Sequence, residues 1–134
     1  MSYTAWKNSD NAAIASKIRP FGNLVNLFTR STASVTTAVT TDIVNAPGAN
    51  YKNYVTSGLV TNAGTVGVWV KIQDDGTNIL YTGYAAAGSG FIIPPGVFTT
   101  TEANMKIQMV TESAGGIDVR CTLVGYVDLA SAPF

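Results

Sequence analysis

The sequence predicts an all-β fold, a jelly-roll-like antiparallel β-sandwich that follows a short N-terminal arm or helix. Apolar and polar residues alternate in several short segments, which is the pattern of strands with one buried face. Turn residues separate these segments about every 8–12 positions, and helical patterns are almost absent. Two packed sheets are a stable arrangement for strands of this kind, so a sandwich is favoured over a closed barrel.

The composition fits one domain with a neutral surface. The chain has 134 residues, of which 12% are charged, and its eight basic and eight acidic residues cancel. A typical soluble domain is about one quarter charged, and no net field draws this chain to nucleic acid or to a membrane. We therefore expect neither of those partners. A surface with so few charges also indicates that neighbouring subunits cover part of it.

Residues that support catalysis or metal binding are scarce. The sequence has no histidine, the residue most often used for zinc binding and for acid-base catalysis near neutral pH. We therefore expect no enzyme activity, no catalytic or metal site and no cofactor. The single cysteine, Cys121, lies in an alternating apolar run and is expected to be a buried thiol rather than a nucleophile.

An N-terminal segment, residues 1–22, shows no strand pattern and is expected to precede a sandwich domain of residues 23–134. Ser9 or Asp10 could cap a short helix that ends before Pro20. An extended arm is the alternative.

The apolar side chains of the N-terminal segment are too few to form a core of their own. They are therefore expected to pack on this domain or to dock on a neighbour. These side chains are Tyr3, Trp6, Ile14 and Ile18. The segment lacks the basic and apolar regions of a signal peptide, which predicts that the chain is made in a cytoplasm.

Three strands are expected before the central hairpin. An apolar run at residues 24–28 predicts the first strand. Residues 34–43 predict the second, because their apolar residues alternate and their dense Thr and Val content favours a strand over a helix. Residues 54–61 predict the third, after a loop at residues 45–53 that is rich in Asn, Pro and Gly.

The central hairpin, residues 65–84, shows the clearest strand pattern. Valine and isoleucine occupy alternate positions from residue 66 to residue 72, and Asp75-Gly76 is a favoured two-residue hairpin loop. Closing the hairpin at this loop brings the apolar residues of both arms to one face. The expected cross-strand pairs are Ile72 with Ile79 and Val70 with Tyr81.

A second hairpin is expected near the C-terminal end of the sequence. Residues 85–90 form a loop, residues 91–93 a short buried strand, and Pro94-Pro95-Gly96 ends it. Residues 105–111 and 117–127 then alternate on either side of a loop. The expected pairs are Met109 with Val119, Ile107 with Cys121, and Met105 with Leu123.

Two features invite a functional interpretation. Asp74-Asp75-Gly76 lacks the spaced carboxylates and final Glu of an EF-hand, so we interpret it as a turn rather than a calcium loop. Trp69 is out of phase with the buried residues of its strand, and Tyr51 and Tyr84 are the other candidates for exposed aromatic residues. Trp69 is expected to pack between sheets or between subunits rather than to stack on a ligand.

Five short matches along residues 51–127 carry a resemblance to a known group of proteins. They are Thr61-Asn62, Asp74-Asp75-Gly76, Pro95-Gly96, Asn104 and Gly125-Tyr126. In this order, within a Gly- and Thr-rich β-sandwich, they resemble small virion proteins of tailed bacteriophages. That group includes head decoration (cement) proteins, head fibres, and neck or tail components.

The resemblance implies a non-enzymatic virion protein that is made in the host bacterial cytoplasm and located on the outer capsid surface. Its expected partners are the major capsid protein and further copies of itself, for example in a trimer. The residues expected at these contacts are Tyr3, Trp6, Ile14, Ile18 and Trp69. The alternative is a fibre, neck or tail-associated module that binds host surface glycans through exposed aromatic residues.

Overall fold

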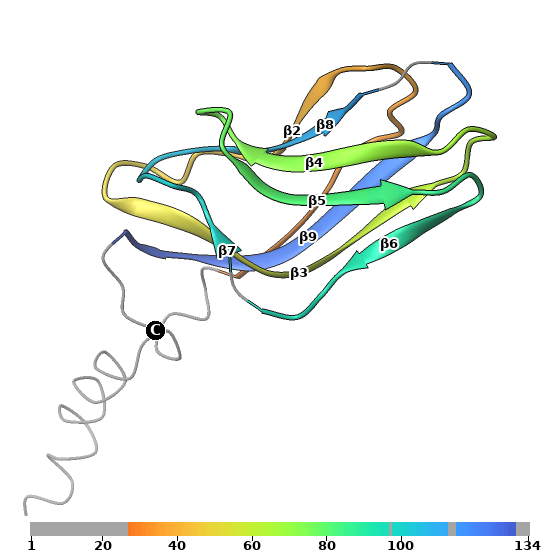
Figure 1. The fold of residues 1–134 in the computed structure, drawn as a ribbon. Helices are drawn as coiled ribbons and strands as arrows, with labels where there is room; N and C mark the ends of the chain where they lie inside the picture. Colours follow the sequence, from red (N-terminus) through yellow and green to blue (C-terminus); the bar gives the residue numbers. More distant parts are fainter. Residues whose placement is uncertain (1–26, 97, 113–114, 131–134) are drawn as a thin grey trace, which may run out of the picture.

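The computed structural model describes residues 27–96, 98–112 and 115–130, which form two antiparallel β-sheets packed face to face (Figure 1). Sheet A has the strand order β1-β9-β3-β6, with β7 also paired to β3, and sheet B has the order β2-β8-β4-β5. The strands are β1 (Leu27–Ser31), β2 (Thr40–Val44), β3 (Tyr51–Asn62), β4 (Val68–Asp74), β5 (Ile79–Ala85), β6 (Ser89–Ile93), β7 (Phe98–Thr99), β8 (Ile107–Thr111) and β9 (Val119–Leu129). The predicted all-β sandwich is confirmed. This strand order is compatible with a jelly roll, and that more specific assignment stays a prediction.

The two longest strands, β3 and β9, form the centre of sheet A. They pair along their whole length, from Tyr51 opposite Leu129 to Asn62 opposite Val119, with a bulge at Thr56. β1 extends the sheet on the far side of β9, and β6 extends it on the far side of β3. Residues late in the sequence therefore lie in the middle of the sheet.

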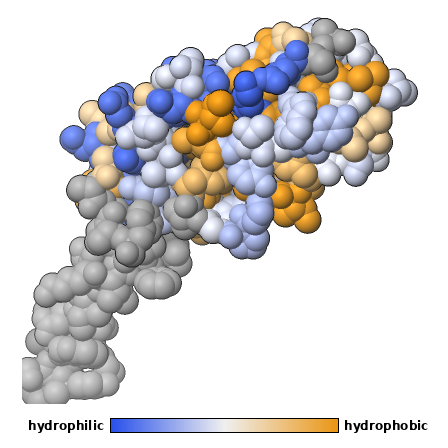
Figure 2. Space-filling view, in the orientation of Figure 1, coloured by the Kyte–Doolittle hydropathy of each residue, from blue (hydrophilic) through white to orange (hydrophobic). Residues whose placement is uncertain are grey.

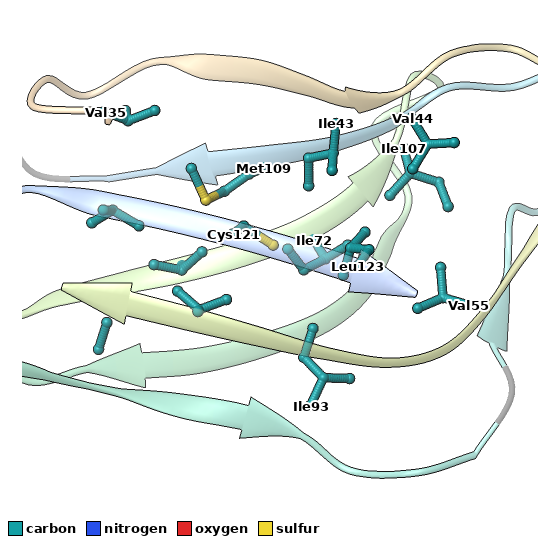
Figure 3. Packing of buried hydrophobic residues seen from close by; sticks show 14 of the residues in the cluster. Val35, Ile43, Val44, Val55, Ile72, Ile93, Ile107, Met109, Cys121 and Leu123 are labelled. Atoms are coloured by element: carbon teal, nitrogen blue, oxygen red, sulfur yellow. The ribbon is translucent and has the colours of Figure 1, made fainter. Parts of the chain in front are cut away.

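The core lies between the sheets and is built from both of them. Figure 3 shows Ile72, Ile107 and Met109 of sheet B pointing toward Cys121 and Leu123 of sheet A. Each of these five side chains is fully buried. Burial raises the pKa of the Cys121 thiol to about 12, so almost no reactive thiolate is present near neutral pH. The predicted buried thiol is confirmed.

The central hairpin forms, but its turn is longer than predicted. The backbone nitrogen of Asp74 donates to the carbonyl of Asn78, and that of Thr77 donates to the carbonyl of Asp74, both at 3.0 Å. The loop therefore has three residues, 75–77, and Thr77 takes the left-handed conformation with φ of 65°. This is the three-residue alternative to the expected Asp75-Gly76 loop.

The predicted pairing of this hairpin is wrong by two positions. Ile72 pairs with Tyr81, and Val70 pairs with Gly83. One position comes from the longer loop and the other from a bulge beside Ile72. Because the shift is even, Tyr81 still faces the core, as predicted, whereas Ile79 is 56% exposed.

The side chain of Asp74 joins this turn to the loop that follows β7. It is fully buried, and its two carboxylate oxygens accept hydrogen bonds from the backbone nitrogens of Gly76, Asn78 and Thr101 and from Thr101 Oγ1, at 2.7–3.1 Å. Burial, the largest single influence, raises the pKa of Asp74. The hydrogen bonds from Thr101 and Asn78 together outweigh it, so the pKa lies below its ordinary value.

The second predicted hairpin is wrong. β8 lies in sheet B, where it pairs with β2 and β4, whereas β9 lies in sheet A. Met109 and Val119 are both buried, as their alternation predicted, but they face the core from opposite sheets. Alternation fixes which face of a strand is buried, and it does not determine the partner strand.

Strand boundaries before the hairpin also differ from the predictions. The segment 34–43 is interrupted, because Val35 makes an isolated bridge to Val119 and β2 begins only at Thr40. Val39 between them is exposed. β1 extends to Ser31, and β3 starts at Tyr51, inside the predicted loop. After the hairpin, the short strand β7 was not predicted.

Candidate interaction surfaces

The middle of the outer face of sheet A, around Thr122 and Val124 of β9, is free of charge, with Arg120 toward one end and the cross-strand neighbours Lys52 and Asp128 toward the other. Alternation with the buried residues Cys121 and Leu123 turns Thr122 and Val124 outward on β9. Their cross-strand neighbours on β1, β3 and β6 share this face, and all are aliphatic or carry a hydroxyl group. We call these residues the neutral face: Leu27, Thr29, Ser31, Ser57, Leu59, Ile92, Thr122 and Val124.

Two hydroxyl groups on the neutral face form a hydrogen bond with each other. Ser31 Oγ and Thr122 Oγ1 share a hydrogen bond of 2.8 Å, and the first charged side chain beyond this row is Arg120. Exposed aliphatic side chains surround this pair, with Ile92 the most exposed at 69%. Such a surface suits contact with another protein, because its burial does not carry the free-energy cost of desolvating a charged side chain.

The outer face of sheet B has the opposite character. Asp42 accepts hydrogen bonds from Lys106 at 3.1 Å and from Gln108 at 2.9 Å, and these contacts, the Gln108 bond first, lower the pKa of Asp42. Lys71 forms an ion pair with Glu112 on the same face. This face presents paired charges to water, so the two faces of the sandwich differ strongly in polarity.

Trp69 lies at one end of the sheet B face, in edge-to-face contact with Tyr84. Their ring centroids are 5.3 Å apart and the rings are inclined by 62°. Trp69 is 53% exposed, which confirms that it is out of phase with the core and excludes packing between the sheets. Tyr51 and Tyr84 are exposed, as predicted.

One side of the sandwich carries no charge on either sheet. The 25 residues from Thr77 to Thr101 contain no Asp, Glu, Lys or Arg, and they include β5 and β6, the edge strands of the two sheets on this side. β5 and β6 contact each other, and Phe91 of β6 stacks on Tyr81 of β5 with ring centroids 6.0 Å apart. We call this side the β5–β6 flank.

Open depressions are present on the surface of the described residues. A depression of about 420 Å³ lies along β3 and β6 beside Leu59 and Ile92, on the neutral face. Within residues 27–96, 98–112 and 115–130, no three His, Cys, Asp or Glu side chains come close enough to hold a metal ion. The same ranges contain no helix that is long and apolar enough to span a membrane.

The structure places only part of the predicted contact set. Trp69 is on the surface, whereas Tyr3, Trp6, Ile14 and Ile18 lie outside the described residues. The neutral face and the β5–β6 flank were not predicted. The uncharged run behind the flank is visible in the sequence, but the neutral face required the strand order of sheet A.

The fold and its surfaces define a small all-β sandwich with one neutral and one charged outer face. No known family model matches the sequence, and no curated protein matches it. Among solved structures, the chain is similar to a chain of the cyanophage Pam1 capsid asymmetric unit, with 18% identity, a TM-score of 0.46, and coverage of 75% of this chain and 84% of that one. It is also similar to part of the Clostridium thermocellum xylanase 10B, crystallised as CBM22-1–GH10 modules with xylohexaose, with 14% identity, a TM-score of 0.41 and 78% of this chain covered. The match spans 25% of that xylanase chain.

Proposed function

We propose that this chain is a structural, non-catalytic protein of a tailed-bacteriophage virion. In this proposal it is a capsid decoration protein that binds the outer surface of the head and stabilises contacts between major capsid subunits. The observation that carries the proposal is the neutral face of sheet A, which lies opposite a face of paired charges. The resemblance of residues 51–127 to small phage virion proteins supports the same role.

The size of the neutral face favours repeated, individually weak attachment. Four strands about 4.8 Å apart and five residues of about 3.3 Å each give an area of roughly 300–400 Å² per partner. A single stable interface buries about 800 Å² per partner, so one such contact is weak. Attachment at many lattice points, or through two segments of one chain, multiplies modest affinities. Residues 1–22 are the proposed second attachment segment.

The number of copies of this chain in purified virions tests the role directly. Quantitative mass spectrometry against the major shell protein is expected to give a ratio comparable to that of the shell protein. A handful of copies per particle would instead indicate a fibre, neck or tail component. Complete absence from the particle would contradict the virion role.

Val124→Lys is expected to weaken binding to capsid shells by about tenfold or more, because it places an unpaired ammonium group in the neutral face. Sedimentation of the purified variant with shells that lack the protein measures this loss. Thr40→Lys is the matched control, because Thr40 is exposed on the charged outer face of sheet B.

Deleting residues 1–19 is expected to abolish shell binding in the same assay. The fold should survive, since the hydrophobic core described above is formed by residues from Phe28 onward. Normal binding by both Val124→Lys and the truncated chain would refute attachment through these two regions.

The aromatic pair favours a second candidate function, recognition of host surface glycans. Exposed tryptophan and tyrosine rings can stack on the apolar faces of sugar rings. Trp69→Ala is then expected to weaken binding to host cells while leaving the melting temperature unchanged, and Tyr51→Ala, at another exposed tyrosine, is the control. A large fall in melting temperature would instead assign Trp69 to packing.

A further inference from the structure

The β5–β6 flank lacks the charges and the proline within a strand that often protect exposed sheet edges. Soluble proteins block such edges with lysines, inward-pointing charges, prolines or bulges, because unpaired backbone groups there can pair with another chain. β5 and β6 carry no charged residue, and Pro94-Pro95 follows β6 only where the strand ends. A bulge is present beside Ile72, toward one end of β5.

The opposite side of the sandwich is protected. β1, the edge strand of sheet A on that side, carries Arg30, and β2, the edge strand of sheet B, carries Asp42, which is paired with Lys106. The same molecule thus has one charged flank and one uncharged flank. This contrast points to a partner on the uncharged flank.

The uncharged flank also exposes aliphatic side chains from both sheets. Ile92 on β6 and Ile79 on β5 are more than half exposed, and the ring of Tyr84 on β5 is nearly so. Ile92 lies where the flank meets the neutral face. Figure 2 shows a hydrophobic group at the lower rim of the molecule, beside residues of intermediate hydropathy, on the side where Figure 1 places β6. The stacked rings of Phe91 and Tyr81 cover the core on this side, so the exposed side chains of Ile79 and Ile92 are not needed for the packing of the single chain.

The area of the flank is sufficient for a specific contact. Seven residues of about 3.4 Å and two sheets about 10 Å apart, with their outward side chains, give roughly 500 Å² per partner. Two partners then bury about 1,000 Å² in total, which is the lower limit for a specific protein interface. Contacts of this size are reversible and depend on concentration.

We infer that the β5–β6 flank is the contact surface between copies of this chain. A second copy fits the flank better than a charged partner, because the flank offers no charge to pair with and two neutral edges meet without like-charge repulsion. Edge strands of equal length and matching polarity can also extend a sheet across the contact. This inference concerns the isolated protein and does not depend on the virion role.

Sedimentation velocity of the purified chain over a range of concentrations tests the inference. We expect reversible association. Ile92→Lys is expected to weaken it by about tenfold or more, because each of the two copies then brings a lysine into the same contact. Leu27→Lys is the matched control, because Leu27 is exposed to a similar degree, 61% against 69% for Ile92, on the opposite edge of the same sheet. Circular dichroism and the melting temperature verify that both variants fold.

Hydrogen exchange gives a second measurement that needs no variant. The backbone amides of β5 and β6 are expected to become more protected as the protein concentration rises, whereas those of β1 and β2 should not. A chain that stays monomeric at all concentrations, or an assembly that Ile92→Lys and Ile79→Lys leave intact, would overturn the inference. Protection of β6 only upon binding to capsid shells would assign the flank to the shell protein and would also overturn it.

Discussion

Asp74→Ala is expected to lower the free energy of unfolding by about 3 kcal/mol, the effect of removing a buried carboxylate that accepts several partly buried hydrogen bonds. In the wild type, the Asp74 carboxylate accepts hydrogen bonds from the backbone nitrogens of Gly76, Asn78 and Thr101 and from the hydroxyl of Thr101. Since a domain of this size is stable by about 5–15 kcal/mol in total, the variant should melt far below the wild type in calorimetry.

The same carboxylate predicts a specific pH dependence. The folded-state pKa of Asp74 is depressed, so its contribution to stability is complete above the unfolded pKa of about 3.9 and is lost as the pH falls through the folded value. The melting temperature of the wild type should therefore fall steeply below about pH 4. Asp74→Asn removes this titration and should show a shallower fall over the same range.

Asp75→Asn is the control for both measurements, because Asp75 is the exposed neighbour in the same turn. It should change the free energy of unfolding by no more than about 0.5 kcal/mol. Equal stability of Asp74→Ala and the wild type would show that this hydrogen-bond network does not hold the turn.

Gly125→Ala is expected to destabilise the fold by about 3 kcal/mol or more, through a clash in β9, one of the two central strands of sheet A. A β-carbon at this position would lie 2.0 Å from the carbonyl oxygen of Tyr54 and 2.7 Å from the ring of Phe28. The first of these neighbours is backbone on the paired strand β3, so it cannot move without breaking the ladder.

Gly96→Ala supplies the comparison. Gly96 has a negative or extended φ, and nothing lies within 4 Å of its added β-carbon. Chemical denaturation should give Gly96→Ala the stability of the wild type, or slightly more, because alanine restricts the unfolded chain. If Gly125→Ala were equally stable, the close approach of β3 and β9 at this point would be wrong.

The sequence predicted the buried faces of the strands well and their partners poorly. Met109 and Cys121 are buried as expected, yet they belong to different sheets, because a period of two carries no information on which strand lies alongside. The central turn was mispredicted for a different reason. The expected two-residue loop is replaced by a three-residue loop in which Asp74 accepts a hydrogen bond from Thr101. Thr101 is 27 residues away in the sequence, so local propensity cannot reveal this partner.

The candidate surfaces also divide into features that the local sequence predicts and features that depend on which strands are neighbours. The exposure of Trp69 was predictable from its phase on β4, and the uncharged run behind the β5–β6 flank is visible in the printed sequence. The neutral face was not predictable, because its members come from β1, β3, β6 and β9 and become neighbours only through the strand order. The predicted contacts of Tyr3, Trp6, Ile14 and Ile18 stay predictions.

The central position of β9 constrains how the chain can fold during synthesis. Among the strands that the structure describes, β9 leaves the ribosome last, yet β1 and β3 both need it as their neighbour. A nascent chain that lacks β9 therefore exposes the long edge of β3, and sheet A can close only after translation has passed residue 129. Folding of sheet A should thus be late and slow, as is typical of sheets built from distant segments, and the chain that still lacks β9 is the species most prone to aggregate.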